Sequence, residues 1–197
     1  MKQLKELLVE FEDALIKAQC PILKKLKAGH DAVFVKELLN RWNIQNGGLT
    51  TLYSWKNGLM NMADSVIGEI ELFPNGSMLP LEEAEEVYNI YTQEESYWDK
   101  NLFPIFTNGG GDYLLYDVDN KSPTYEMIFL YAPSLLLDEK PQTKYDSLES
   151  LIETQIQCLN NDSYNFDSKG IYDIDYDLLY EISAKHNPKS KYWDEYR

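Results

Sequence analysis

Three consecutive glycines separate two apolar segments near the middle of the chain, in the stretch FPIFTNGGGDYLLYD (103–117). A glycine run that binds phosphate opens a helix, because the free N–H groups at the helix start hold the anion. Here the next segment, DYLLYDV, is short, aromatic and flanked by turn residues, which is typical of a strand. The loop also lacks the lysine of a Walker-type loop. We therefore expect Gly109, Gly110 and Gly111 to form a hairpin connection that needs positive φ angles, so that Gly110→Val lowers stability without loss of a ligand.

The chain offers no pattern that indicates a metal or cofactor. The aspartates after the glycine run, Asp112, Asp117 and Asp119, do not follow the spacing of an EF-hand loop. Cys20 and Cys158 lack the spacing of a zinc site or a disulfide framework. We expect two reduced thiols, no metal and no cofactor.

Apolar residues recur at helical spacing in several segments. They predict helices over 2–18, over a segment after Asp31, over 49–56, over 81–91 and over 146–159. Asp31 is expected to cap the second helix, Asn57-Gly58 to end the third, and Asp146 with Glu149 to form a capping box on the last.

Other segments are typical of strands. Alternation predicts a half-buried strand in VIGEIELF (66–73), closed by a turn at 74–76. Apolar runs predict strands over 103–106 and 112–118 as well. The stretch TYEMIFLYAP (124–133) is apolar on both faces and predicts a central strand covered on both sides.

The chain changes character after the predicted helix at 146–159. The stretch from 163 onward is polar, acidic and rich in tyrosine, so we expect a loop, a short helix from about Asp177 to Lys185, and a weakly structured tail. The predicted organisation is an α+β domain over 1–162, including the N-terminal helix, followed by a C-terminal extension over 163–197.

Charge limits the partners that such a chain can bind. The 197 residues carry a formal net charge of -15, which repels nucleic acid and anionic lipid and attracts basic proteins. Fifteen tyrosines and four tryptophans favour half-wet protein interfaces. Acidic residues interrupt any apolar signal region at the start, and no uncharged run is long enough to cross a membrane. We expect a cytoplasmic protein with no nucleic-acid or membrane partner.

In combination and order, several segments resemble the SUKH superfamily, the Smi/Knr type related to regulators of fungal cell-wall assembly. The matching residues are Leu52-Tyr53 with Asn57-Gly58, the segment Leu79 to Ala84, Phe103-Pro104-Ile105, Gly109-Gly110-Gly111-Asp112-Tyr113, and Asp117. The resemblance covers roughly residues 20–160 and leaves the C-terminal extension outside.

The resemblance implies a central, mostly antiparallel sheet with helices around it, and no catalytic residues. It also implies a protein-binding function, since bacterial members are often immunity proteins that neutralise a toxin, in many cases a nuclease. The acidic composition agrees with this, because an anionic inhibitor imitates the nucleic acid that a basic nuclease binds.

We therefore predict a non-enzymatic immunity protein whose acidic clusters and aromatic residues bind a basic toxin. The candidate binding residues are Glu82, Glu85, Glu86, Glu94, Glu95, Tyr97, Trp98, Asp99, Asp173, Asp175 and Tyr176. The alternative is a scaffold or adaptor that binds a non-toxic protein; a small-ligand-binding protein and an enzyme rank below it. His30 and His186 lie in no metal or nucleophile motif, and the oligomeric state stays open.

Overall fold

The computed structural model describes residues 2–59, 65–94, 97–133, 140–167 and 170–196. Its α-helices are α1 (Leu4–Lys17), α2 (Ala32–Asn40), α3 (Gly47–Trp55), α4 (Leu81–Asn89), α5 (Leu148–Asn160) and α6 (Tyr176–His186). Short helical turns are η1 (Pro21–Lys24), η2 (Ile67–Glu69), the π-helical η3 (Ile90–Glu94) and η4 (Lys191–Tyr196). Among these, α1, α4, α5 and α6 follow the helical spacing in the sequence, and Asp31 caps α2 as predicted by accepting from Val33 N–H.

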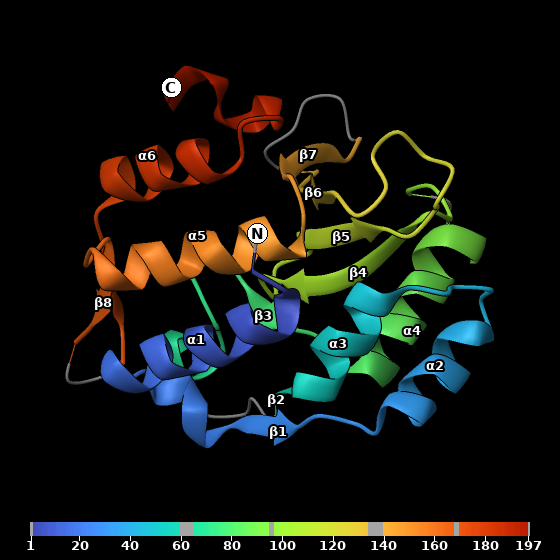
Figure 1. Cartoon of the computed structure of the whole chain (residues 1–197), viewed down its shortest axis with the longest axis horizontal. Coiled ribbons are helices and arrows are strands. Elements are labelled where there is room, and N and C mark those ends of the chain that lie inside the picture. Colours follow the sequence, from blue (N-terminus) through green and yellow to red (C-terminus); the bar gives the residue numbers. More distant parts are fainter. Residues whose placement is uncertain (1, 60–64, 95–96, 134–139, 168–169, 197) are drawn as a thin grey trace.

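A five-stranded antiparallel sheet forms the centre of the fold. Its order is β3-β4-β5-β6-β7, with strands at Ser77–Met78, Leu102–Thr107, Tyr113–Asp117, Ile128–Tyr131 and Gln142–Tyr145. Two small antiparallel pairs lie outside it, β1 (Leu26–Ala28) with β2 (Lys56–Leu59) and β8 (Tyr164–Phe166) with β9 (Tyr172–Ile174). Figure 1 shows α5 and α1 side by side across the sheet, and α6 over α5. The protein is thus an α+β fold, as predicted.

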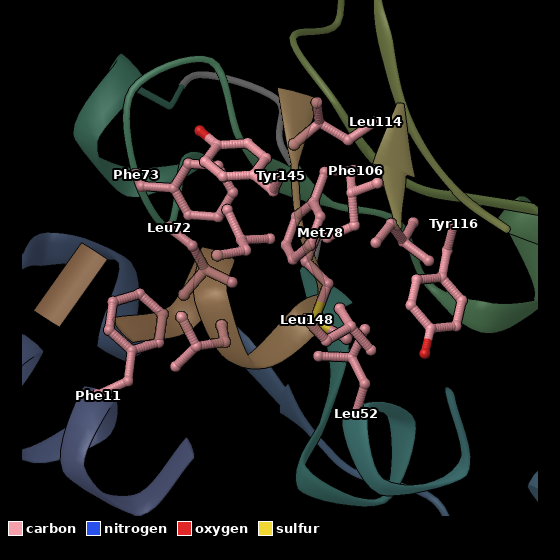
Figure 2. Packing of buried hydrophobic residues seen from close by; sticks show 14 of the residues in the cluster. Phe11, Leu52, Leu72, Phe73, Met78, Phe106, Leu114, Tyr116, Tyr145 and Leu148 are labelled. Atoms are coloured by element: carbon pink, nitrogen blue, oxygen red, sulfur yellow. The ribbon is translucent and has the colours of Figure 1, made fainter. Parts of the chain in front are cut away.

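Alternation along the central strands divides the apolar residues between the two faces of the sheet. Leu114, Tyr116 and Ile128 point toward the helices, whereas Leu115 and Tyr131 belong to a smaller cluster on the opposite face. In Figure 2, Phe11 of α1, Leu52 of α3 and Leu148 of α5 lie in one cluster with Phe106 and Leu114 of the sheet. We call the first side the helix-covered face and the second the aromatic face.

The glycine-containing connection is a hairpin, as predicted, because Thr107 pairs with Tyr113 across it. Gly109 and Gly111 have positive φ angles of 73° and 103°. Gly110 does not, and a Cβ built there meets nothing nearer than Asn108 Oδ1 at 3.4 Å. The expectation that Gly110→Val strains the turn is therefore wrong, and the positions that need glycine are its two neighbours.

Two predicted strand positions are also wrong. Residues 66–73 contain the turn η2 and no strand, because Leu72 and Phe73 both enter the core, where alternation would separate them. The turn at 74–76 holds Leu72, whose N–H donates to Gly76 O. The strand predicted to begin near residue 124 begins only at Ile128, since Glu126 has a φ of 68°.

Two helix ends differ from the prediction. The N-cap of α5 is Ser147, in a capping box with Ser150, while Asp146 accepts from Lys189 N–H instead. Asn57-Gly58 does not end α3; it lies in β2. Asn57 Oδ1 accepts from Leu81 N–H at 2.8 Å, so this asparagine caps the start of α4 from a distant part of the chain.

The C-terminal residues are more ordered than the sequence indicates. The stretch expected to be a loop forms the β8–β9 hairpin, and the tail expected to be weakly structured forms η4. Trp193 of this tail is almost fully buried, and its Nε1 donates to Lys144 O at 2.6 Å. Tyr164, Ile182 and Trp193 join the same core as the helices and sheet.

Candidate protein-binding surface

Helix α4 carries the largest predicted acidic cluster, and neighbouring loops fix its position. Pro80 precedes the helix, and Asn57 caps its first turn. Gly58 has a φ of 65°, and a Cβ there lies only 2.5 Å from Pro80 N, so this close approach requires glycine. The motif Asn57-Gly58 therefore sets where α4 begins.

Two glutamates of α4 are bonded within the protein. Glu82 accepts from Asn57 Nδ2 at 3.1 Å and lies 2.9 Å from His30 Nε2. Partial burial acts to raise the pKa of Glu82, but the hydrogen bonds it accepts outweigh this and hold the pKa below its usual value.

Glu85 has a similar internal role. It accepts from Trp42 Nε1 at 3.0 Å and lies 3.4 Å from Arg41. Glu82 and Glu85 thus tie α4 to residues around α2, which leaves less of their charge for a partner.

Three other carboxylates on this side are exposed. Glu83 and Glu86 project from α4, and Asp99 follows the next loop. Within the residues that the structure describes, none of the three forms an ion pair. Glu83, which sequence reasoning did not select, belongs with Glu86 because both lie on the solvent side of the helix. Glu95 lies outside the described residues, as does the side chain of Glu94.

The two aromatic residues predicted beside these acids occupy different environments. Tyr97 is 50% exposed, and its ring lies 5.2 Å from that of Tyr91. Trp98 is only 5% exposed; it stacks on Tyr91 at 4.5 Å and meets Tyr131 edge-on at 5.0 Å. Trp98 is therefore a buried member of the cluster on the aromatic face, and Tyr97 is the ring that is exposed to solvent.

The aromatic face extends from these residues over the sheet. The half-buried rings of Tyr91, Tyr113 and Phe129 pack against the buried cluster around Trp98 and Tyr131. Tyr113 follows from the alternation in β5, but its contact with Tyr91 at 5.4 Å joins segments 22 positions apart. Pattern reasoning along one segment does not detect such a contact.

The second acidic cluster lies elsewhere. Asp173, Asp175 and Tyr176 are exposed at β9 and the start of α6, and Asp175 caps α6 by accepting from Leu178 N–H at 3.0 Å. Figure 1 shows α4 and α6 at opposite ends of the long axis. The structure therefore distributes the predicted binding residues over two separate surfaces.

The remaining motif residues make contacts within the protein. Asn108 accepts from the N–H groups of Gly110 and Asp112, and Asn108 Nδ2 donates to Asp112 Oδ2 at 2.8 Å. Asp117 is fully buried and accepts from Asn101, Asp119 N–H and Thr124.

Other motif residues lie in the core. Leu52, Tyr53 and Phe103 are fully buried, and Pro104 pairs with Leu115 across β4 and β5. In the described part of the chain, no group of His, Cys, Asp or Glu side chains could hold a metal ion. A helix long and apolar enough to cross a membrane is likewise absent from that part.

Comparison with known proteins agrees with this architecture. A search of curated proteins finds no match. The family model described as SMI1 / KNR4 family (SUKH-1) matches residues 36–154, from α2 into α5. The matched range contains the five-stranded sheet, the Asn57-Gly58 cap of α4 and the glycine hairpin. The chain therefore belongs to the SMI1/KNR4 (SUKH-1) family.

Proposed function

We propose that this chain is an immunity-type binding module that captures and neutralises a basic toxin domain. The observation that carries the proposal is that Tyr97 is half exposed near α4, while Glu83, Glu86 and Asp99 are exposed and form no ion pair among the residues that the structure describes. This surface combines the two features that a basic partner needs, an aromatic anchor and uncompensated negative charge.

Geometry keeps these features together. Tyr97 N–H donates to Tyr91 O at 2.8 Å, and Tyr91 follows Glu83 by eight residues in a continuous helical segment. Eight residues correspond to about 12 Å along a helix. Glu83, Glu86 and the tyrosines therefore fit within one interface of ordinary size, which buries about 800 Å² on each partner.

The negative charge of the chain should raise the rate at which it associates with a basic partner. A net charge of -15 steers a basic protein toward this chain, and steering raises association rates by factors of about 10 to 1,000. Because salt screens such steering over about 10 Å at 0.1 M ionic strength, binding should weaken as salt rises. Rapid capture suits a protein that must stop a toxin before it acts.

The candidate nucleophiles support binding rather than catalysis. Burial raises the pKa of the Cys20 thiol to about 12 and that of Cys158 to about 11, so neither forms a reactive thiolate near neutral pH. His30 contacts Glu82 and Asn57, both of which position α4. His30 thus has structural partners, and the two cysteines are buried.

Toxicity rescue tests the proposal. Basic proteins captured from lysate of the native cells are each expressed alone and then together with this chain. We expect one of them to stop growth alone and co-expression to restore growth. The triple variant Glu83→Gln/Glu86→Gln/Asp99→Asn should lose the rescue. The matched control Asp173→Asn/Asp177→Asn/Glu181→Gln removes the same charge from the far end and should keep it.

Two results would contradict the proposal. If the partner that binds this surface is harmless when expressed alone, the chain is an adaptor instead. If the control variant loses the rescue and the α4 variant keeps it, the binding surface lies on α6 and β9.

A further inference from the structure

A small hollow of about 190 Å³ lies where the C-terminal extension meets the sheet. Its walls come from the turn at 74–75, the tip of the β4–β5 hairpin, strand β7 and helix α6 with η4. Ligand pockets for drug-sized molecules are about 300–1,000 Å³, so this hollow admits only a small molecule. Tyr176, Tyr180 and Trp193 of the wall lie beyond the range 36–154 that the family model matches.

Lys144 enters this hollow because β7 contains a bulge. Ile128 of β6 pairs with Tyr145, but Phe129 pairs with Thr143, so Lys144 has no partner across the strands. An extra residue of this kind redirects its side chain, and bulges of this type recur beside binding sites. Trp193 Nε1 donates to Lys144 O and thereby fixes the bulge from the extension.

Three aromatic rings lie near the ammonium group of Lys144. Its Nζ lies 5.0 Å from the ring centre of Tyr192, 5.7 Å from that of Trp193 and 5.9 Å from that of Tyr145. Rings stabilise the positive charge but accept no conventional hydrogen bond from its three donors. Among the described residues, no oxygen lies within ion-pair or hydrogen-bond distance of this Nζ.

A negative charge, that of Asp112, lies on another wall of the hollow. Asp112 lines it from the hairpin tip, and its Oδ2 accepts from Asn108 Nδ2. Its Oδ1 has no hydrogen-bond partner in the part of the chain that the structure describes. Burial lowers the pKa of Lys144 to about 8, and the charge of Asp112 acts against this shift. The two groups therefore influence each other without touching.

We propose that this hollow binds a small zwitterion of the amino-acid class, with its carboxylate on Lys144, its ammonium group on Asp112 and its carbon atoms against the rings. A simple anion would pair with Lys144 and be repelled by Asp112. A simple cation would pair with Asp112 and be repelled by Lys144. Only a ligand with both charges satisfies both walls, and Lys144 and Asp112 are both partly buried, so water solvates each charge incompletely.

This site shares Tyr113 with the aromatic face, but Glu83, Glu86, Tyr97 and Asp99 of the proposed toxin-binding surface do not line it. Figure 1 shows α6 at the opposite end of the long axis from α4, with β7 nearer the middle. The proposal rests on the hollow alone and holds whether or not the chain neutralises a toxin. It also gives the C-terminal extension a role, since the rings of Tyr192 and Trp193 lie over the ammonium group of Lys144.

Ligand titration of the full-length chain tests the proposal. The twenty common L-amino acids are added singly, and the melting temperature and the heat of binding are recorded. At least one should bind saturably. Its carboxamide, which lacks the negative charge, and its deaminated acid, which lacks the positive charge, should each bind at least tenfold more weakly. Lack of binding by all twenty, or equal binding of either analogue, would overturn the proposal.

Variants locate the binding. Lys144→Met keeps the length of the stem, and Asp112→Asn keeps an acceptor for Asn108 Nδ2, so both should fold. Each should weaken binding at least tenfold, whereas Lys121→Met, which changes an exposed lysine on another loop, should leave it unchanged. Retained affinity in Lys144→Met would overturn the assignment. If Lys144→Met fails to fold, the test rests on Asp112→Asn alone, and retained affinity in that variant would overturn the assignment.

Discussion

The two faces of the central sheet are built from alternate residues of the same strands, yet their covers differ. On the helix-covered face, Leu114, Tyr116 and Ile128 belong to one buried cluster with residues of α1, α3 and α5. On the aromatic face, rings from the segment after α4 form the cover, and Tyr97 stays half exposed. The first face buries its residues in one large core, which stabilises the fold. The second presents ring surface to solvent, which suits recognition.

The largest expected effect is a loss of stability that differs between the two faces of the sheet. Phe106→Ala removes a fully buried ring from the helix-covered face and should lower the free energy of unfolding by about 3–5 kcal/mol. Phe129→Ala, on the aromatic face, removes a partly buried ring and should cost only about 1–2 kcal/mol. Urea unfolding measures both. Equal losses would show that the aromatic face is as much a part of the stabilising core as the other.

The buried carboxyl group of Glu71 lies beside the core, so its protonation should affect stability. Glu71 is 3% exposed, next to Leu72 and Phe73, and burial raises its pKa to about 7. Its folded pKa exceeds the unfolded value, so its contribution is favourable at low pH and is lost as pH rises from about 4.5 through 7. Glu71→Gln keeps an acceptor for Asn75 N–H and should stabilise the protein by up to about 3 kcal/mol at pH 8.

The measurement for Glu71 is chemical denaturation at several pH values. We expect the advantage of Glu71→Gln to disappear near pH 4, where the glutamic acid is protonated in both states. An advantage that does not change with pH would mean that titration of Glu71 is not its cause.

Substitutions in the hairpin that joins β4 to β5 should lower stability by a smaller amount, and the middle glycine serves as the control. Gly109→Ala and Gly111→Ala place a side chain at positive φ and should each cost about 1–2 kcal/mol. Gly110→Ala should be neutral or stabilise slightly, because its φ is ordinary and a Cβ fits. Thermal melting distinguishes the three. Equal losses at all three positions would contradict this assignment.

The smallest effect on stability is expected at the exposed ring. Tyr97→Ala should change the free energy of unfolding by about 0.5 kcal/mol or less, as surface substitutions usually do. The same change should weaken binding of the captured toxin at least tenfold, since exposed aromatic residues carry much of an interface's affinity. Calorimetry measures the affinity. Tyr196→Ala, at an exposed tyrosine on η4, is the matched control and should leave affinity unchanged.

Local patterns predicted much of this fold. Helix spacing found α1, α4 and α5, Asp31 was identified as a cap, and the glycine run predicted the β4–β5 hairpin. Each of these features depends on residues close together in the chain, where propensity and turn chemistry decide the outcome.

The predictions from sequence are wrong where contacts between residues far apart in the chain determine the structure. Asn57 caps Leu81 from 24 positions away, which no helix-end rule detects. The tail after Pro188 becomes ordered because Trp193 and Ser190 bond to the free edge of β7. The acidic neighbours of Trp98 predict a binding residue at the surface, but three tyrosines from other elements pack against its ring.

Hydrogen–deuterium exchange of the chain with and without its captured toxic partner tests the central claim most directly. We predict that binding slows exchange in the segments 81–94 and 97–101, around α4 and Tyr97, and leaves 172–186 unchanged. Slower exchange confined to β9 and α6, with none around Tyr97, would contradict the assignment of the aromatic face as the binding surface.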